Sequence, residues 1–229
     1  DVTEPLDRAV MAKLALVIRQ ATDALNAYEH SKALEVIESF FWQFCDDYIE
    51  LVKNRAYGTA DAHGKVPSDA AVKSARTTLG LGLDAFARLL APYLPFATEE
   101  VWSWMHTGEG SVHRAAWPKA DIYAAAATGA SPETLAWAGK AVEQLRKIKS
   151  EAKVSMKTPI LSVTLAAVKD GIDAIKSALD DVAQAGRVIG KFDLAEKHAE
   201  EAAAEGEGDD TVVIDASELG EPPAKKAKK

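Results

Sequence analysis

Two prolines, Pro92 and Pro95, interrupt an otherwise helical pattern in the middle of the chain. Proline lacks a backbone N–H and fixes its φ angle, so neither residue can continue a helix. We therefore expect one helix to end near Leu90 and another to begin just after Pro95. Thr98 is placed to accept a backbone N–H bond at the start of the second helix. The prolines thus predict a corner between two packed helices.

Apolar residues recur at spacings of three and four on both sides of this corner, as one face of an amphipathic helix does. High alanine content also favours helices over sheets. The pattern predicts helices over residues 4–28, 31–55, 68–90 and 96–106. Gly80 and Gly82 lie inside the third of these, where each should cost about 1 kcal/mol relative to alanine, and close helix packing is the simplest explanation. Residues 1–118 are therefore predicted to form an antiparallel helical bundle.

The second half of the chain has a mixed pattern. Residues 119–131 are rich in alanine, and we expect a linker there. Ser131-Pro132-Glu133 then opens a helix, residues 170–184 are amphipathic, and residues 160–166 and 188–194 alternate like strands. A small α+β domain is predicted over residues 132–216, with an acidic insert at 195–210 and a late strand-like segment at 211–215. Residues 217–229 are predicted to be a disordered, lysine-rich tail.

The formal net charge is −8, of which −6 falls in residues 193–229. Contact with nucleic-acid phosphates depends on a local basic face and not on the total charge. The composition therefore leaves two classes of function open. One is a nucleic-acid-binding domain with a basic face, and the other is a helical protein-interaction module without RNA binding.

The sequence shows few features of catalysis or metal binding. A single cysteine, Cys45, excludes an internal disulfide and a Cys-rich metal site, and its place on an apolar stripe favours a small core residue over a nucleophile. The five histidines show no metal-ligand spacing. We find neither an apolar run of about 18 residues nor a secretion leader, so the cytosol is the expected compartment.

Three segments, in order along the chain, carry a resemblance. Residues 88–102 read Arg-Leu-Leu-x-Pro-x-x-Pro-Phe-x-Thr-Glu-Glu-x-Trp, residues 41–50 precede them with Phe-Trp-Gln-Phe-Cys-Asp-Asp-Tyr-Ile-Glu, and Gly-Ser-Val-His at 110–113 with Trp-Pro at 117–118 follows. This order resembles the anticodon-binding helical bundle of class I aminoacyl-tRNA synthetases. Among the members that handle branched aliphatic amino acids, the valyl enzymes are most similar and the isoleucyl enzymes are the alternative.

The resemblance implies a tRNA-binding, C-terminal part of a larger ligase. The two signature motifs of the family's catalytic domain do not occur here, so we expect no catalytic residue and no activity of this chain alone. ATP-dependent attachment of valine to its tRNA would belong to that absent domain. The implied partners are valine tRNA and the catalytic and editing domains of the same polypeptide. We expect a cytoplasmic monomer without cofactor, metal or membrane, in which the first helix of the family's bundle is absent.

The family binds the anticodon near the end of the helix that corresponds to residues 31–55, which points to Lys53, Asn54 and Arg55. A cation pairs with phosphate or stacks on a base, and an amide can read a base edge. The alternative is that Lys53 and Arg55 only interact with the C-terminal dipole of their helix. Trp42 flanks the apolar stripe, where it could stack on a base or pack against a neighbouring helix.

Residues 140–157 are the second RNA-binding candidate, because six basic and two acidic residues give them a local charge of +4. Phosphate contact by such a run is independent of sequence and sensitive to salt. The alternative is a solvated helix face. The tRNA-binding residues predicted in this run are Arg146, Lys147, Lys149, Lys153 and Lys157.

Overall fold

A computed structural model of the chain describes residues 1–197 and 211–221, without the side chains of residues 215 and 216. The chain forms two compact units, Asp1–Ile49 with Asp69–Pro132, and Glu50–Ser68 with Glu133–Lys229. The predicted fold class, a helical bundle followed by a small α+β domain, is confirmed for the described residues. The predicted bundle bounds of 1–118 differ from the first unit, because residues 50–68 pack with the second unit and residues 119–132 belong to the first.

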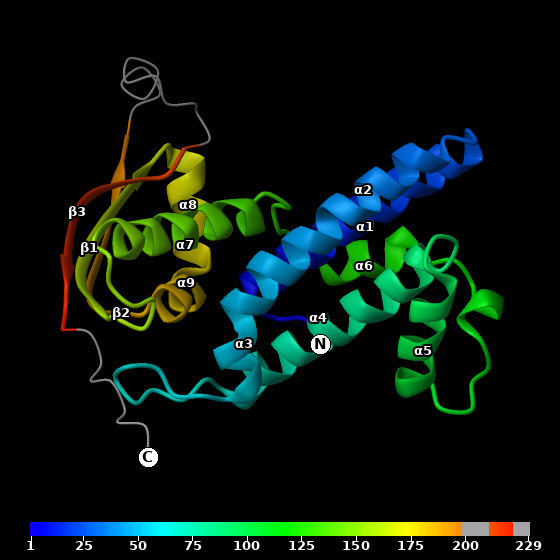
Figure 1. Cartoon of the computed structure of the whole chain (residues 1–229), viewed down its shortest axis with the longest axis horizontal. Helices are drawn as coiled ribbons and strands as arrows, with labels where there is room; N and C mark the ends of the chain where they lie inside the picture. The colour runs from blue at the N-terminus through cyan, green and yellow to red at the C-terminus, as the bar shows by residue number, and fades with distance from the viewer. Residues whose placement is uncertain (198–210, 222–229) are drawn as a thin grey trace. The chain divides into compact units, whose positions relative to one another are not determined.

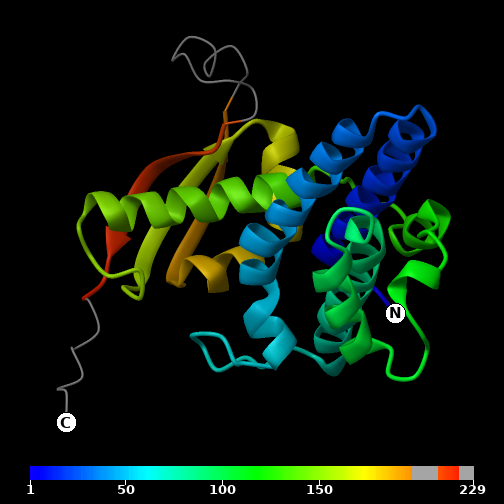
Figure 2. The same cartoon turned by 45° about the vertical axis from the view of Figure 1, so that its right-hand side comes forward.

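The first unit is built around helix α1 (Pro5–Asn26), which contacts α2, α4 and α6. Figure 2 shows α1 and α2 side by side. The other elements are α2 (His30–Gln43), the π-helical turn η1 (Phe44–Tyr48), α4 (Asp69–Leu90), α5 (Pro95–Met105), the 3-10 helix η2 (Val112–Arg114) and α6 (Ala120–Ala126). Pro5 stands in the first turn of α1, where its missing N–H costs nothing.

The proline corner is confirmed, since α4 ends at Leu90 and α5 begins at Pro95. The expectation for Thr98 was wrong. Its hydroxyl donates to the carbonyl oxygen of Leu94, 2.9 Å away, and caps no N–H. Hydroxyls inside a helix commonly bond back to the carbonyl four residues earlier, and the start of α5 lacks a side-chain cap.

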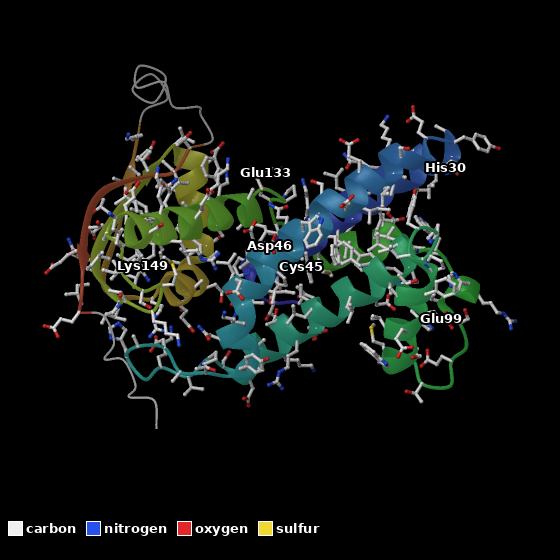
Figure 3. All side chains as sticks on the ribbon, viewed as in Figure 1. His30, Cys45, Asp46, Glu99, Glu133 and Lys149 are labelled. Atoms are coloured by element: carbon white, nitrogen blue, oxygen red, sulfur yellow. The ribbon has the colours of Figure 1, made fainter. Side chains whose placement is uncertain are left out.

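Two of the three segments that carry the family resemblance, residues 88–102 and 110–113, are joined by hydrogen bonds in the structure. Glu99, labelled in Figure 3, accepts hydrogen bonds from the Ser111 hydroxyl at 2.8 Å and the Val112 amide at 3.0 Å. The Trp102 indole donates to the carbonyl oxygen of Gly110 at 3.1 Å. The motif therefore fixes the path of the chain after α5, which is a structural role and not a chemical one.

The aromatic helix predicted over residues 31–55 is interrupted by η1, whose Phe44 and Tyr48 are buried. The Tyr48 hydroxyl donates to the carboxylate of Asp7 at 2.8 Å, and the Ser74 hydroxyl donates to its other oxygen at 2.6 Å. Asp7 has no solvent exposure. Because a buried carboxylate is stable only when hydrogen-bonded, this network fixes η1 and α4 against α1.

Residues 119–131 do not form the expected linker. They contain α6, which contacts α1 and buries Tyr123 in the first unit. The Arg88 guanidinium donates to the Tyr123 hydroxyl at 3.1 Å and also pairs with Asp84. The alanine-rich segment forms a closely packed helix here. Composition alone does not distinguish such a helix from a linker.

The second unit contains a three-stranded sheet with α7, α8 and α9 on one side of it (Figure 1). Its elements are α3 (Ile49–Tyr57), α7 (Thr134–Glu151), β1 (Ile160–Ala167), α8 (Lys169–Ser177), α9 (Leu179–Gly186), β2 (Val188–Glu196) and β3 (Val213–Leu219). The strand order is β2-β1-β3, with β2 parallel and β3 antiparallel to β1. The single helix expected over 170–184 is two helices that divide at Ala178.

Two predicted boundaries were wrong in this unit. Strand β2 continues through Glu196, into the expected acidic insert, and β3 continues through Leu219, into the expected disordered tail. Both extensions pair with β1, so ladder hydrogen bonds decide the strand ends. The rest of those two predictions concerns residues 198–210 and 222–229, which lie outside the described residues.

Candidate nucleic-acid interface

Helix α7 and the turn that follows it present four of the predicted basic residues to solvent. Arg146 and Lys147 lie on its exposed side, and Lys153 and Lys157 follow in the turn after it. The opposite side of α7 is buried through Leu135, Ala138, Val142 and Leu145. Because burial fixes the helix rotation, the cations must face outward. We call Arg146, Lys147, Lys153 and Lys157 the basic surface.

Lys149 does not belong to the basic surface. Figure 3 labels it on α7, and only 2% of the residue is exposed. Its ammonium donates to the carbonyl oxygens of Gly186, at 2.7 Å, and Met156, at 3.3 Å. Burial, together with the smaller effect of the positive charges of Arg187 and Arg146, lowers the pKa of the ammonium to about 8. The prediction that Lys149 binds tRNA is corrected, because the group is occupied inside the unit.

Lys53 and Arg146, predicted in two separate candidate regions, meet in the second unit. The Glu50 carboxylate lies 2.7 Å from the Lys53 ammonium and 3.6 Å from the Arg146 guanidinium. Both basic side chains remain about half exposed, at 45% and 44%. Exposed pairs of this kind hold their charges weakly, so both cations stay available to a phosphate. The structure therefore joins the first half of α3 to the basic surface.

Arg55 is buried, with 6% of the residue exposed. Its Nε and one terminal nitrogen each donate to a carboxylate oxygen of Asp181, both at 2.9 Å. This bidentate geometry is the strongest pairing that arginine and a carboxylate form. A guanidinium so enclosed cannot reach a phosphate, so the prediction of Arg55 as an RNA contact is corrected. The pair fastens α3 to α9.

Asn54 and Trp42 are placed differently from each other. Asn54 is half-buried at the end of α3 and lines a cavity of about 450 Å³ in the second unit. Trp42, in the first unit, is 54% exposed, and its indole donates to Glu38 on the same helix at 3.3 Å. About half of Trp42 is therefore accessible, and both stacking on a base and packing against a neighbouring helix stay predictions.

Three further residues of that cavity were missed by the sequence analysis: His63, Gln184 and Arg187. They come from the loop after α3, from α9 and from its C-cap. No spacing along the chain connects them, since the loop and α9 are more than a hundred residues apart. Of these three residues, only Arg187 could have been anticipated. It follows Gly186 at the end of a helix, where a residue in the left-handed conformation is common.

The described residues offer little for metal or redox chemistry. They contain no group of three or more His, Cys, Asp or Glu side chains that could hold a metal ion. Cys45 is half-buried, and burial raises the pKa of its thiol, which weakens it as a nucleophile. Over the same residues, no helix has the length and apolar character to cross a membrane.

Comparison with known proteins finds similarity to tRNA ligases in both a family model and individual relatives. A family model described as the anticodon-binding domain of tRNA ligase matches residues 7–165. A valine-tRNA ligase of Bifidobacterium longum (strain NCC 2705) is 80% identical over 100% of the chain. Valine-tRNA ligases of Thermobifida fusca and Cutibacterium acnes are 47% and 42% identical, over 82% and 100% of the chain. The chain spans 25%, 20% and 24% of these three relatives, respectively.

Proposed function

Because the chain belongs to the family of anticodon-binding domains of tRNA ligases, we propose that it binds the anticodon side of valine tRNA as part of a valine-tRNA ligase. The isoleucine enzyme, which the sequence motifs left as an alternative, is disfavoured by the relatives, which are named as valine-tRNA ligases at up to 80% identity. Binding at the anticodon side would hold the tRNA while its acceptor end is charged.

The catalytic part of the proposal lies outside this chain. ATP-dependent attachment of valine would be carried out by the remaining three quarters of the ligase polypeptide, with which this domain would act as one monomer in the cytoplasm. This chain would contribute no catalytic residue and hold no cofactor. Its contribution to the reaction would be affinity and position, which lower the cost of bringing the two reactants together.

The exposed basic surface on and after α7 is the observation that best supports tRNA binding. Its four cations are solvent-facing while the chain as a whole carries a charge of −8. Local positive potential, and not total charge, determines contact with a phosphate backbone. Lys53 is a fifth cation, about half exposed. It is linked to the basic surface because Glu50 pairs with both Lys53 and Arg146. Trp42 would add a stacking face in the first unit.

A salt titration of tRNA binding tests the proposal. Each lost phosphate contact should reduce the slope of log affinity against log salt by roughly 1. Substituting all four residues of the basic surface with alanine should therefore reduce the slope by about 3 to 4. Lys73→Ala, which removes an exposed cation of α4 in the first unit, is the matched control and should leave the slope unchanged.

Specificity is tested with three RNAs: valine tRNA, isoleucine tRNA and a valine tRNA with a changed anticodon. Tighter binding of the unaltered valine tRNA is the expected result. Equal, steeply salt-dependent binding of all three would contradict anticodon reading and leave only phosphate contact. Absence of binding even at low salt would reject the proposed function and favour a protein-interaction module.

A further inference from the structure

The first unit contains a cavity of about 740 Å³ between α1 and the segment that leads into α6. Helix α6 lies against α1 (Figure 1), and residues 116–121 form the wall opposite α1. Protein cavities of about 300–1,000 Å³ hold small organic ligands. We call this space the α1–α6 cavity.

Hydrogen bonds fix both walls of the α1–α6 cavity. The Trp117 indole donates to the Thr22 hydroxyl at 2.9 Å, and this hydroxyl donates to the carbonyl oxygen of Ile18 at 2.6 Å. From α4, the Arg88 guanidinium donates to the carbonyl oxygen of Ala116 at 3.3 Å. Walls that are already fixed lose little conformational freedom when a ligand enters, so more of the contact energy appears as affinity.

Part of the lining is apolar. Ile18 and Pro118 are buried, and Trp117 is half-buried. Because the indole N–H of Trp117 is used by Thr22, what this side chain offers a ligand is its ring. Aromatic rings attract one another in offset-stacked or edge-to-face arrangements, in addition to the gain from burial. The lining therefore favours a ligand with an aromatic body.

Two cations and two anions also line the cavity, all of them exposed: Arg19, Lys119, Asp23 and Asp121. The Arg19 guanidinium pairs with the Asp121 carboxylate at 3.3 Å, although Asp23 lies one turn further along the same helix. The side chains of Asp23 and Lys119 make no hydrogen bond or ion pair with another residue in the described part of the chain. One carboxylate and one ammonium are therefore left for a ligand.

This pair of groups selects for a ligand that carries both signs of charge. A simple anion attracted by Lys119 is repelled by Asp23, and a simple cation meets the opposite combination. A zwitterion satisfies both, because its ammonium donates to a carboxylate and its carboxylate accepts from an ammonium. The flexible four-carbon stem of Lys119 lets its ammonium follow the ligand. An α-amino acid has both charged groups on one carbon atom.

We propose that the α1–α6 cavity binds a free aromatic α-amino acid, with Asp23 accepting from its ammonium, Lys119 donating to its carboxylate and Trp117 contacting its ring. No residue of this cavity belongs to the basic surface, so the site goes beyond the proposed contact with tRNA.

Binding of three compounds to the full 229-residue chain tests the proposal. They are L-phenylalanine, phenethylamine, which lacks the carboxylate, and 3-phenylpropanoate, which lacks the ammonium. We expect L-phenylalanine to bind with a dissociation constant on the order of 1 mM, as is usual for a ligand of this size. Each analogue should bind about tenfold more weakly, because it leaves one charged group of the cavity without a partner.

The indole N–H signal of Trp117 in an NMR spectrum gives a local measure of binding. The chain has five tryptophans, and the signal that disappears in Trp117→Phe is that of Trp117. L-Phenylalanine should shift this signal, and the fitted shifts give the dissociation constant of each compound.

Two substitutions separate the roles of the charged groups. Asp23→Asn should weaken binding of L-phenylalanine about tenfold without weakening that of 3-phenylpropanoate, which has no ammonium. Lys119→Gln should weaken L-phenylalanine similarly without weakening phenethylamine. Asp46→Asn and Lys73→Gln are the matched controls, because they remove an exposed acid and an exposed base of the first unit that do not line the cavity. Both controls should leave all three affinities unchanged.

Equal affinity for the three compounds, or equal losses in a variant and its control, would overturn the proposal. A Trp117 signal that stays in place up to about 20 mM L-phenylalanine would also overturn it. Neither result would bear on the proposed function, which the salt titration of tRNA binding tests separately.

Discussion

Replacing Arg55 with methionine should destabilise the second unit and should not act by removing an RNA contact. The substitution removes a guanidinium that donates two 2.9 Å hydrogen bonds to Asp181. The two side chains are only 7% and 10% exposed, so the carboxylate left behind is poorly solvated. Loss of one member of such a buried pair typically costs about 3–5 kcal/mol. A domain is stable by only about 5–15 kcal/mol, so the loss is a large fraction of the total.

Amide hydrogen exchange measures this effect separately in each unit. Strand β1 pairs with both β2 and β3, so its amides report on opening of the second unit. A loss of about 3–5 kcal/mol should accelerate their exchange by roughly two to four orders of magnitude. The amides of α1, in the first unit, serve as the internal control and should exchange as before.

A double substitution separates stability from RNA contact. Arg55→Met with Asp181→Leu removes both charges, and replacing a buried pair with apolar residues is often close to neutral. The double variant should recover most of the protection in β1 and should bind RNA with unchanged affinity. If Arg55→Met left the exchange of β1 unchanged but reduced the salt dependence of RNA binding, Arg55 would be a phosphate ligand and the interpretation of the buried pair would be refuted.

Two further predictions use matched pairs of variants. Gly82→Ala should destabilise the first unit by about 1–3 kcal/mol, because its new Cβ would lie 2.6 Å from the packed ring of Phe44. Gly80→Ala meets nothing within 4 Å and should stabilise it by up to about 1 kcal/mol; equal shifts in the two urea midpoints would contradict this. The stability of the second unit should also rise with pH, because the pKa of Lys149 is about 8 when folded and near 10.5 when unfolded. Between these values the unfolded chain binds the extra proton, so from about pH 7.5 to 9.5 the gain is about 2 kcal/mol. Lys149→Met should abolish this rise and Lys147→Met, on the exposed side of α7, should keep it; a rise that persists in Lys149→Met would point to another group.

The sequence was sufficient to predict the long helices and the strands, although it missed α6 and the interruptions at η1 and Ala178. Proline chemistry placed the corner at Pro92 and Pro95, because a missing N–H and a fixed φ act locally in any fold. Period-three-and-four spacing identified the buried side of each long helix for the same reason. Boundaries were less predictable where pairing decides them, as at the ends of β2 and β3.

Helical spacing also contained the information that would have corrected two site predictions. Arg55 follows Leu51 and Val52 by four and three residues, and Lys149 follows Leu145 by four, so both cations stand on buried stripes. Their charge suggested an RNA contact, although their position in the helix indicated burial. Local periodicity was the better guide, because rotation of a helix is fixed by its apolar side.

Tertiary structure alone decided what these buried cations meet and which polar groups remain free. Arg55 pairs with Asp181, and Lys149 donates to the carbonyl oxygen of Gly186, at separations along the chain that no local pattern spans. The cavity beside Asn54 likewise joins a loop to α9 and β2. The polar side chains that line this cavity, Arg187 among them, could be identified only from the folded structure. The sequence determined each element and its buried side through short-range sterics and periodicity, whereas the site depends on contacts between distant segments.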